Sequence, residues 1–151
     1  ERSLRLNLLS HQWIARAAAE VMQAQGLGGA LLFNASKAAF NPGPAFGPHA
    51  IPKAALIALM RQLAIDWGKY GIRSNAVNAD RVRTRSLEGR ALEARAKARG
   101  VSPEEYFRAN LLSRETTAED VAEAFVYLAT AEATTGCVLT VDGGNSAAFP
   151  R

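Results

Sequence analysis

Three side chains have the chemistry and spacing to move a proton at a small polar substrate. His49 and Lys53 are four residues apart at the start of a long apolar helix pattern, so they lie one turn apart on one face. An imidazole is a general acid or base near neutral pH, and a nearby lysine and a helix N-terminus both favour its neutral form. Ser36 closes the preceding apolar run. Taken alone, Ser36 would only satisfy backbone groups at a strand end, and Lys53 would be an exposed lysine.

The elements that must position these residues are alternating helices and short apolar strands. Helical spacing covers Ser3–Gly26, with Gly26 as the stop, and Ile51–Gly71, where Pro52 is acceptable because it lies in the first turn. The proline- and glycine-rich segment between them, Asn41–Pro48, must be an ordered loop. Strands are predicted in Gly28–Ser36, Ile72–Asn78 and Gly136–Gly144.

The second half of the chain contains a polar, arginine-rich region and two further helix starts. Ser102 is a predicted N-cap, and Thr117 and Asp120 have the spacing of a capping box before the amphipathic helix Thr117–Glu132. Much of the net charge of +4 lies in Arg81–Gly100, where glutamates are interleaved with arginines. This pattern is interpreted first as a solvated helical face and second as an anion-binding patch.

The order of these elements predicts an α/β fold. Nearly continuous apolar strands separated by helices favour a Rossmann-like, doubly wound parallel sheet of about three strands with flanking helices. A three-stranded sheet is thin, and an edge strand as apolar as Ala30–Phe33 would offer an unpaired template for association. We therefore expect the chain to be part of something larger.

Length and composition exclude several classes of protein. The chain has 151 residues, 48% of them hydrophobic and 21% charged, which is typical of one soluble domain. Its longest apolar run is too short to cross a bilayer, and no secretory leader pattern opens it. The single cysteine, Cys137, excludes an internal disulfide and offers no metal cluster, so we expect a cytoplasmic, metal-free protein. Aromatics do not alternate with the basic residues, so nucleic acid is not an expected partner.

Several spaced features together resemble a known family. Asn7 lies in the helix before the first strand, Ser36 closes that strand, Lys53 follows in the next helix, and the chain continues with "GIRSNAVNADRVRT" and "TTGCVLTVDGG". From Leu4 to about Asn145 the chain resembles the C-terminal half of a short-chain dehydrogenase/reductase. The resemblance implies that residues 1–151 are the C-terminal part of a single Rossmann domain, whose cofactor-binding N-terminal half is absent from this chain.

The resemblance implies hydride transfer between NAD or NADP and a small alcohol, aldehyde or ketone. In the family a tyrosine moves the proton, a lysine favours the phenolate and holds the cofactor ribose, a serine polarises the substrate oxygen, and an asparagine holds a water. Asn7, Ser36 and Lys53 match three of these positions, and the spacings from Ser36 and Lys53 both place His49 at that of the tyrosine. His49 is then a catalytic replacement, the mark of a degenerate site, or a loop residue without a role. The double coincidence in spacing favours replacement slightly over degeneration and ranks the loop residue last.

The same resemblance places further cofactor contacts in the loop after the second strand. Asp80, Val82 and Thr84 match cofactor-binding positions beside Lys53, although the Pro-Gly of the family is here Ala79-Asp80. Asp80 next to Arg81 and Arg83 predicts a loop ion pair, with an acidic substrate for the arginines as the alternative. No glycine-rich turn follows a strand, so this chain alone is not expected to bind a dinucleotide in the usual way.

Two stretches of the chain resemble one group within the family more closely, and a non-catalytic role is the competing hypothesis. "FNASKAAFNPGPAFGP" and "PKAALIALMRQLAIDWG" resemble the dehydrogenase module of bifunctional rhamnulose-1-phosphate aldolase/short-chain dehydrogenases, which implies lactaldehyde or a related sugar-derived substrate. The competing hypothesis is a non-catalytic module that acts in assembly. In the family the helices matching Ser3–Gln25 and Pro52–Lys69 form a four-helix contact, so a homo-oligomer, a dimer or tetramer, is expected. An intact glycine-rich turn upstream of Glu1 would favour the enzyme.

Overall fold

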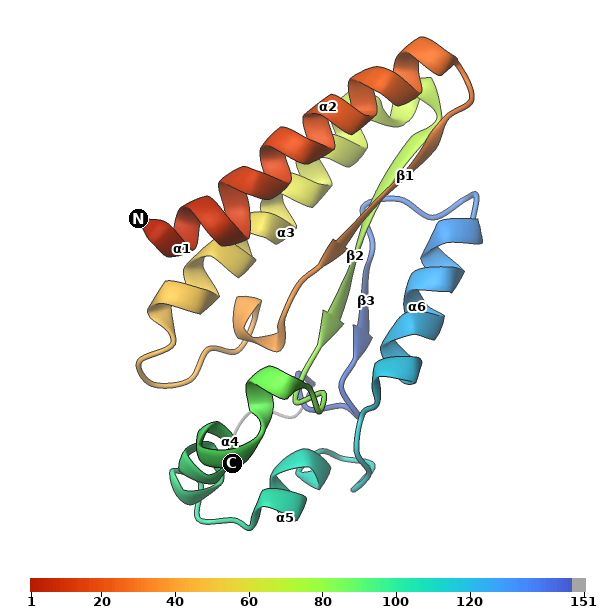
Figure 1. Cartoon of the computed structure of the whole chain (residues 1–151). Coiled ribbons are helices and arrows are strands. Elements are labelled where there is room, and N and C mark those ends of the chain that lie inside the picture. Colours follow the sequence, from red (N-terminus) through yellow and green to blue (C-terminus); the bar gives the residue numbers. More distant parts are fainter. Residues whose placement is uncertain (148–151) are drawn as a thin grey trace.

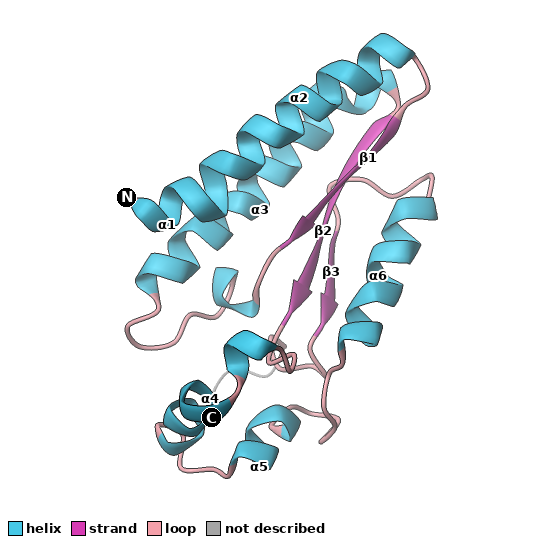
Figure 2. Cartoon of the chain, viewed as in Figure 1, coloured by secondary structure: helices cyan, strands magenta, loops and turns pink. Residues whose placement is uncertain are grey.

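A three-stranded parallel sheet lies between two layers of helices (Figures 1 and 2). The computed structural model describes residues 1–147. The strands run in the order β1 (Gly29–Asn34), β2 (Ile72–Ala79) and β3 (Val138–Val141). Helices α2 (Ser10–Gln25) and α3 (Gly47–Trp67) cover one face, and α6 (Ala118–Thr130) covers the other. The predicted α/β, Rossmann-like arrangement of parallel strands and flanking helices is confirmed.

The central strand β2 is buried on both faces, and its polar side chains are used to hold its neighbours. Gly29 of β1 lies opposite Ile72, and Ala76 lies opposite Val138 of β3. The fully buried Ser74 donates from its hydroxyl to the carbonyl of Met60 in α3 at 2.8 Å. Buried hydroxyls need such partners, because an unpaired one costs free energy. The "IRSNAVN" segment is therefore a strand whose polar residues fix the layers around it.

The first helix is continuous and contains a π-helical segment that its sequence did not indicate. It consists of α1 (Arg2–Leu4), the π-helix η1 (Arg5–Leu9) and α2. Within it the Asn7 amide donates to the Ser3 carbonyl at 3.2 Å, a side-chain bond that competes with regular helix bonding. Gly26 ends the helix at φ 69°, and its N–H donates to the carbonyls of Met22 and Gln23. The predicted glycine stop is confirmed.

Helix α3 begins at Gly47, four residues before the predicted start, which corrects the expected loop Asn41–Pro48. Pro48 lies in the first turn, where its missing N–H is no loss. Pro52 is consequently beyond the first turn, contrary to the prediction, and leaves the Pro48 carbonyl without its helical donor. The Ser3 hydroxyl donates to that carbonyl instead. His49 therefore lies inside the helix and not in the loop before it.

A separate helical unit lies beyond the carboxyl ends of the strands (Figure 1). It contains α4 (Gly89–Lys97) and α5 (Pro103–Arg108), joined to β2 by a loop with one short 3-10 turn, Arg85–Leu87. The helical face expected over Arg81–Gly100 thus begins only at Gly89, because the preceding residues follow the end of the sheet in irregular backbone. The unit has its own small core, made of Leu87, Leu92, Ala96, Tyr106 and Phe107.

Both predicted helix starts in this half are confirmed. The Ser102 hydroxyl accepts from the backbone N–H of Glu105, whose carboxylate accepts from the Ser102 N–H in return. Thr117 and Asp120 form the same reciprocal pair at the start of α6.

Two other apolar clusters hold the sheet between its helices. One joins α2 and α3 to the sheet around Leu56, Met60 and Ile72, and the other joins α6 to it around Val77 and Leu128. Within residues 1–147, no helix combines the length and apolarity that crossing a membrane requires.

Candidate active site

Ser36 and His49 meet where the first strand ends. Ser36 lies two residues beyond β1, and its hydroxyl accepts from the Ala38 N–H at 3.2 Å, capping the 3-10 turn η2 (Lys37–Ala39). The first turn of α3 brings His49 to the same point, with Nε2 3.3 Å from Ser36 Oγ. The pair predicted from spacing is thus in hydrogen-bond contact. Ser36 also performs the backbone-capping role that a serine alone would suggest.

The surroundings of His49 favour its neutral form. The side chain is half-buried, and burial is the largest cause that lowers its pKa below the ordinary 6.5, followed by the positive charges of Lys53 and Arg95. Its ring packs edge-on against Phe46, with centroids 6.2 Å apart. With the proton on Nδ1, Nε2 accepts a hydrogen bond from the Ser36 hydroxyl. The imidazole is therefore arranged as a base at neutral pH.

Lys53 is buried at the end of β1 and is not the exposed lysine of the alternative interpretation. It is 9% exposed, and its ammonium donates to the Asn34 carbonyl at 2.7 Å. Burial lowers its pKa below the ordinary value. The ammonium keeps a positive charge near His49, while its predicted contact with a cofactor ribose stays a prediction.

Among the described residues, no hydrogen bond joins Asn7 to Ser36 or His49. Its amide donates to Ser3 Oγ at 3.3 Å, and the Ser3 hydroxyl in turn donates to the carbonyl of Pro48, one residue before His49. Asn7 thus supports the start of α3 through Ser3. Its predicted part in holding a water stays a prediction.

A cavity of about 490 Å³ opens beside the Ser36–His49 pair. Its walls include the three loop residues predicted from the resemblance, Asp80, Val82 and Thr84. Other walls come from residues that the sequence reasoning did not place in a site: Lys37, Phe46, Arg95, Arg99 and Tyr106. Arg95 and Arg99 are four residues apart, the spacing of one helix face. This spacing was not used in the sequence analysis, because the segment was interpreted first as a solvated face.

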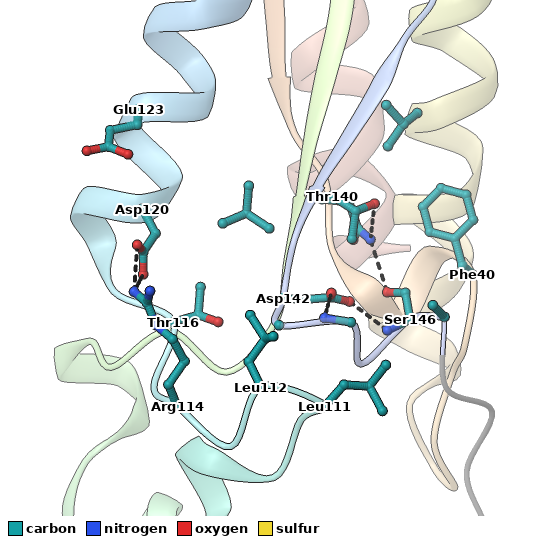
Figure 3. Close-up of a pocket in the computed structure, with 16 residues that line it drawn as sticks. Phe40, Leu111, Leu112, Arg114, Thr116, Asp120, Glu123, Thr140, Asp142 and Ser146 are labelled. Carbon is teal, nitrogen blue, oxygen red and sulfur yellow. Dashed lines mark hydrogen bonds and ion pairs between the residues drawn. The ribbon is translucent and has the colours of Figure 1, made fainter.

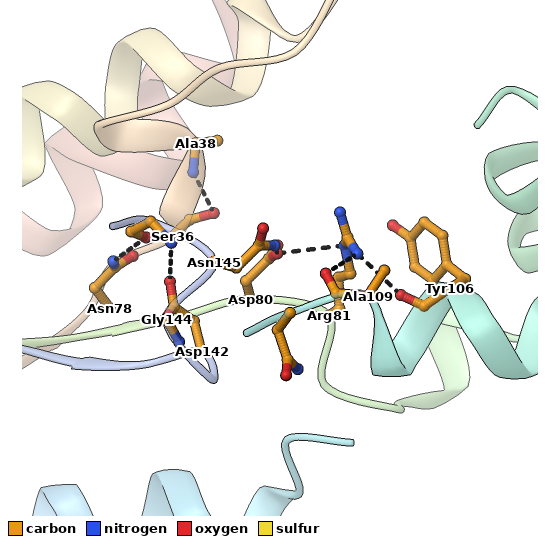
Figure 4. A network of polar contacts seen from close by, with 12 residues as sticks. Ser36, Ala38, Asn78, Asp80, Arg81, Tyr106, Ala109, Asp142, Gly144 and Asn145 are labelled. Carbon is orange, nitrogen blue, oxygen red and sulfur yellow. Dashed lines mark hydrogen bonds and ion pairs between the residues drawn. The ribbon is translucent and has the colours of Figure 1, made fainter. Parts of the chain in front are cut away.

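The loop after β2 is held by a polar network around Arg81 (Figure 4). Arg81 Nε lies 3.4 Å from Asp80 Oδ2, which confirms the predicted ion pair for this arginine. Its Nη1 donates to the carbonyls of Tyr106 and Ala109 at 3.1 and 2.8 Å, and Asn145 donates to Asp80. Arg81 adopts φ 51°, a strained conformation for a side-chain-bearing residue that these contacts hold in place.

Arg83 does not join that network. It pairs with Glu115 through two bonds, Nε–Oε1 at 2.9 Å and Nη2–Oε2 at 3.0 Å.

A second cavity, of about 890 Å³, lies between β3 and α6 (Figure 3). Its volume is the larger, yet its walls contain neither Ser36 nor His49. The buried Asp142 there accepts from the backbone N–H groups of Gly144 and Ser146 at 2.9 and 2.6 Å, and Asp120 pairs with Arg114 at 2.8 Å. These carboxylates serve turns and helix caps, so the candidate active site is the smaller cavity with the paired serine and histidine.

The chain is similar to known oxidoreductases over nearly its whole length. A family model described as "Enoyl-(Acyl carrier protein) reductase" matches residues 1–146. The Bacillus subtilis "Uncharacterized oxidoreductase YuxG" is 37% identical over the whole chain, which covers 23% of that protein. An "L-rhamnose 1-dehydrogenase (NAD(P)(+))" from Sphingomonas is 34% identical over 95% of the chain and 55% of its own length.

The fold is also found among solved structures. A short-chain type dehydrogenase/reductase from Mycobacterium ulcerans superposes with a TM-score of 0.86 at 29% identity, covering 98% of this chain and 52% of that one. The chain thus spans from about a quarter to about half of the length of these three proteins.

Proposed function

The chain belongs to the short-chain dehydrogenase/reductase family, and from that premise we propose that it is the C-terminal half of an NAD(P)-dependent oxidoreductase domain. The proposed reaction interconverts a small alcohol with its aldehyde or ketone. The observation that carries the proposal is the contact of Ser36 Oγ with His49 Nε2 at 3.3 Å, at the carboxyl end of a parallel sheet. Ligands of open α/β sheets bind outside the carboxyl ends of the strands.

The residues present fit the nicotinamide end of such a cofactor. The cavity lies beyond the ends of β1 and β2, and Ser36, His49, Val82 and Thr84 are among the residues that line it. When bound, the nicotinamide accepts or supplies the hydride. In the described part of the chain, no helix follows a strand through a glycine-rich turn. The proposal therefore assigns the binding of the diphosphate to sequence outside these 151 residues.

In this proposal Ser36 and His49 handle the substrate oxygen and its proton. The Ser36 hydroxyl holds the oxygen of the substrate alcohol, and neutral His49 takes the hydroxyl proton on Nε2 as the alcohol is oxidised. The nearby charges of Lys53 and Arg95 oppose the resulting imidazolium and favour release of the proton to water. In the reverse direction the imidazolium returns the proton to the carbonyl oxygen. An imidazole is shorter than a phenol, so the substrate approaches closely or a water bridges the gap.

The substrate is the least defined part of the proposal. The sequence resemblance favours lactaldehyde or a related sugar-derived compound, and one relative is named as a dehydrogenase of the sugar L-rhamnose. The chain covers 23% of YuxG, so most of that protein lies outside the match. A second domain, such as the aldolase that the resemblance implies, is proposed on this ground for the protein that contains this chain.

Steady-state turnover with NAD⁺ or NADP⁺, measured on the whole purified protein that contains these 151 residues, tests the proposal. His49→Ala should lower kcat by about 100-fold or more, because a positioned acid–base group contributes about that much. His11→Ala is the matched control, since His11 is the chain's other histidine and is not among the residues that line the cavity. Equal rates for the wild type and His49→Ala would remove His49 from the mechanism.

One observation favours assembly as a second function. Large apolar side chains are exposed on the outer helices, among them Trp13 and Ile14 on α2 and Ile65 on α3, at 62, 70 and 75% exposure. Exposed apolar faces of this kind mark association surfaces. A homo-oligomer built through α2 and α3 is proposed on this basis, with or without catalysis.

A further inference from the structure

The cavity beside the Ser36–His49 pair carries more positive than negative charge. Four cationic side chains line it, and Asp80 is the one carboxylate among the lining residues. Asp80 is already paired with Arg81. Among residues 1–147 no ion pair is formed by the other three cations, Lys37, Arg95 and Arg99. The cavity therefore presents three cationic groups without a matching partner.

Aromatic rings hold the two arginines of the α4 side toward the cavity. The Arg95 guanidinium lies 5.7 Å from the centre of the Phe46 ring, and Arg99 lies 5.3 Å from that of Tyr106. Contact with a ring face leaves the N–H groups at the edge of a guanidinium free to donate. Both arginines are thus oriented while their donors stay available, which is the arrangement that recognises carboxylates and phosphates.

The cationic groups lie next to the residues proposed to react. Phe46, which orients Arg95, also packs against the His49 ring. Lys37 directly follows Ser36, and its pKa is lowered first by burial, with Asp80 and Asp142 acting on it in the opposite direction. A group bound by these cations would be part of the same small molecule whose oxygen contacts Ser36 and His49.

We propose that the substrate of this site carries an anionic group, a carboxylate or a phosphate, that is bound by Arg95, Arg99 and Lys37. The inference rests on the proposed function, because it takes the Ser36–His49 pair as the reacting end. It narrows the substrates named there: a phosphorylated sugar derivative carries such a group, and lactaldehyde does not.

Binding titrations followed by NMR on the purified protein test the anionic group without requiring turnover. The probes are two matched pairs, lactate against lactamide and glycerol 3-phosphate against glycerol. We expect the anionic member of at least one pair to bind about tenfold more tightly, and the stronger pair to identify the carboxylate or the phosphate. Added salt should weaken this preference, because the groups are solvent-accessible.

Substitutions of the cavity arginines test whether these residues cause the preference for the anionic probe. Arg95→Gln and Arg99→Gln should each weaken binding of the anionic probe by about three- to tenfold, with no change for the neutral probe. Arg90→Gln is the control, since it removes the same charge from α4 at a residue that does not line the cavity. Equal binding of charged and neutral probes, or an equal effect of Arg90→Gln, would overturn the inference.

The outcomes separate this inference from the proposed function. Anion binding that depends on Arg95, combined with turnover that is indifferent to His49, would keep the anion site and reject the mechanism. Turnover that depends on His49 without a preference for anionic probes would do the reverse. If the arginine variants weaken binding of inorganic pyrophosphate but leave lactate and glycerol 3-phosphate unchanged, the cations serve the cofactor and the substrate assignment is wrong.

Discussion

At the scale of single residues, His49 should determine how the activity depends on pH. Burial, Lys53 and Arg95 all lower its pKa below 6.5, so the base is neutral above that pH and is lost as the pH falls below it. We expect kcat/KM for alcohol oxidation to be level above about pH 7 and to fall in the acid range. His49→Tyr should replace this limb with one that rises toward alkaline pH, since a phenol has an ordinary pKa of about 10.

A second variant checks the cause of that shift. Arg95→Gln removes a positive charge that lowers the His49 pKa, so its acid limb should move to higher pH, whereas Arg90→Gln should leave it in place. The measurement is the pH dependence of kcat/KM for the wild type, His49→Tyr, Arg95→Gln and Arg90→Gln in one buffer series. A wild-type limb that survives unchanged in His49→Tyr would show that another group titrates.

The residue scale also shows what spacing predicted and what it missed. The family's spacings from Ser36 and from Lys53 both pointed to His49, and the structure brings His49 into contact with Ser36. A strand end and a helix turn are local geometries that sequence determines closely. Arg95 and Arg99 were missed because their segment is exposed and polar, and exposure alone does not tell whether a side chain faces solvent or a cavity. Their position depends on how α4 docks beyond the sheet, which is a long-range property.

At the scale of elements, the unit formed by α4 and α5 should open independently of the sheet. Phe107 is 1% exposed, and its cluster is separate from the two that hold the sheet. Phe107→Ala should destabilise the unit by about 3 kcal/mol, the usual cost of such a cavity. Local opening should then speed tryptic cleavage within α4 by at least about tenfold, with little change in the melting temperature.

The matched control for that unit is Leu112→Ala, which truncates an apolar side chain that is 67% exposed. It should leave the cleavage rate in α4 unchanged. A large fall in melting temperature for Phe107→Ala, without faster cleavage in α4, would mean that the unit unfolds only with the whole sheet.

The element boundaries show where local signals succeed. The Gly26 stop and the Thr117–Asp120 cap were predicted because each depends on a few adjacent residues. The start of α3 was placed four residues late, because Pro52 signals a first turn and the compensating donor, Ser3, is remote in sequence. The π-helical turn at Asn7 likewise carries no periodicity of its own.

At the scale of the whole molecule, the outer face of α2 and α3 should mediate self-association. Ile14→Glu or Ile65→Glu places a charge on that face and should shift an oligomer to monomers, because burying an unpaired charge is costly. Val126→Glu is the control: Val126 is 64% exposed and lies on α6, across the sheet. Sedimentation of the three variants and the wild type gives the result. A wild type that is monomeric at about 100 μM would remove the assembly proposal.

The thin sheet was predicted from the count of apolar runs, and the structure adds the strand order β1-β2-β3. In the described part of the chain, β1 pairs with β2 alone. Gly29 and Ala35 donate their N–H groups to carbonyls on the β2 side, at 3.2 and 2.8 Å. Since successive N–H groups of a strand point to opposite sides, those of Ala30 and Leu32 point toward the other edge.

That alternation divides the amide protons of β1 into two classes. Those directed at β2 exchange with deuterium only when the sheet opens, whereas those of Ala30 and Leu32 exchange freely unless a further strand covers them. Slow exchange of the second class in the intact protein would be the signature of a sheet that continues past β1. The exchange rates of the Ala30 and Leu32 amides thus report whether a further strand of the domain pairs with β1.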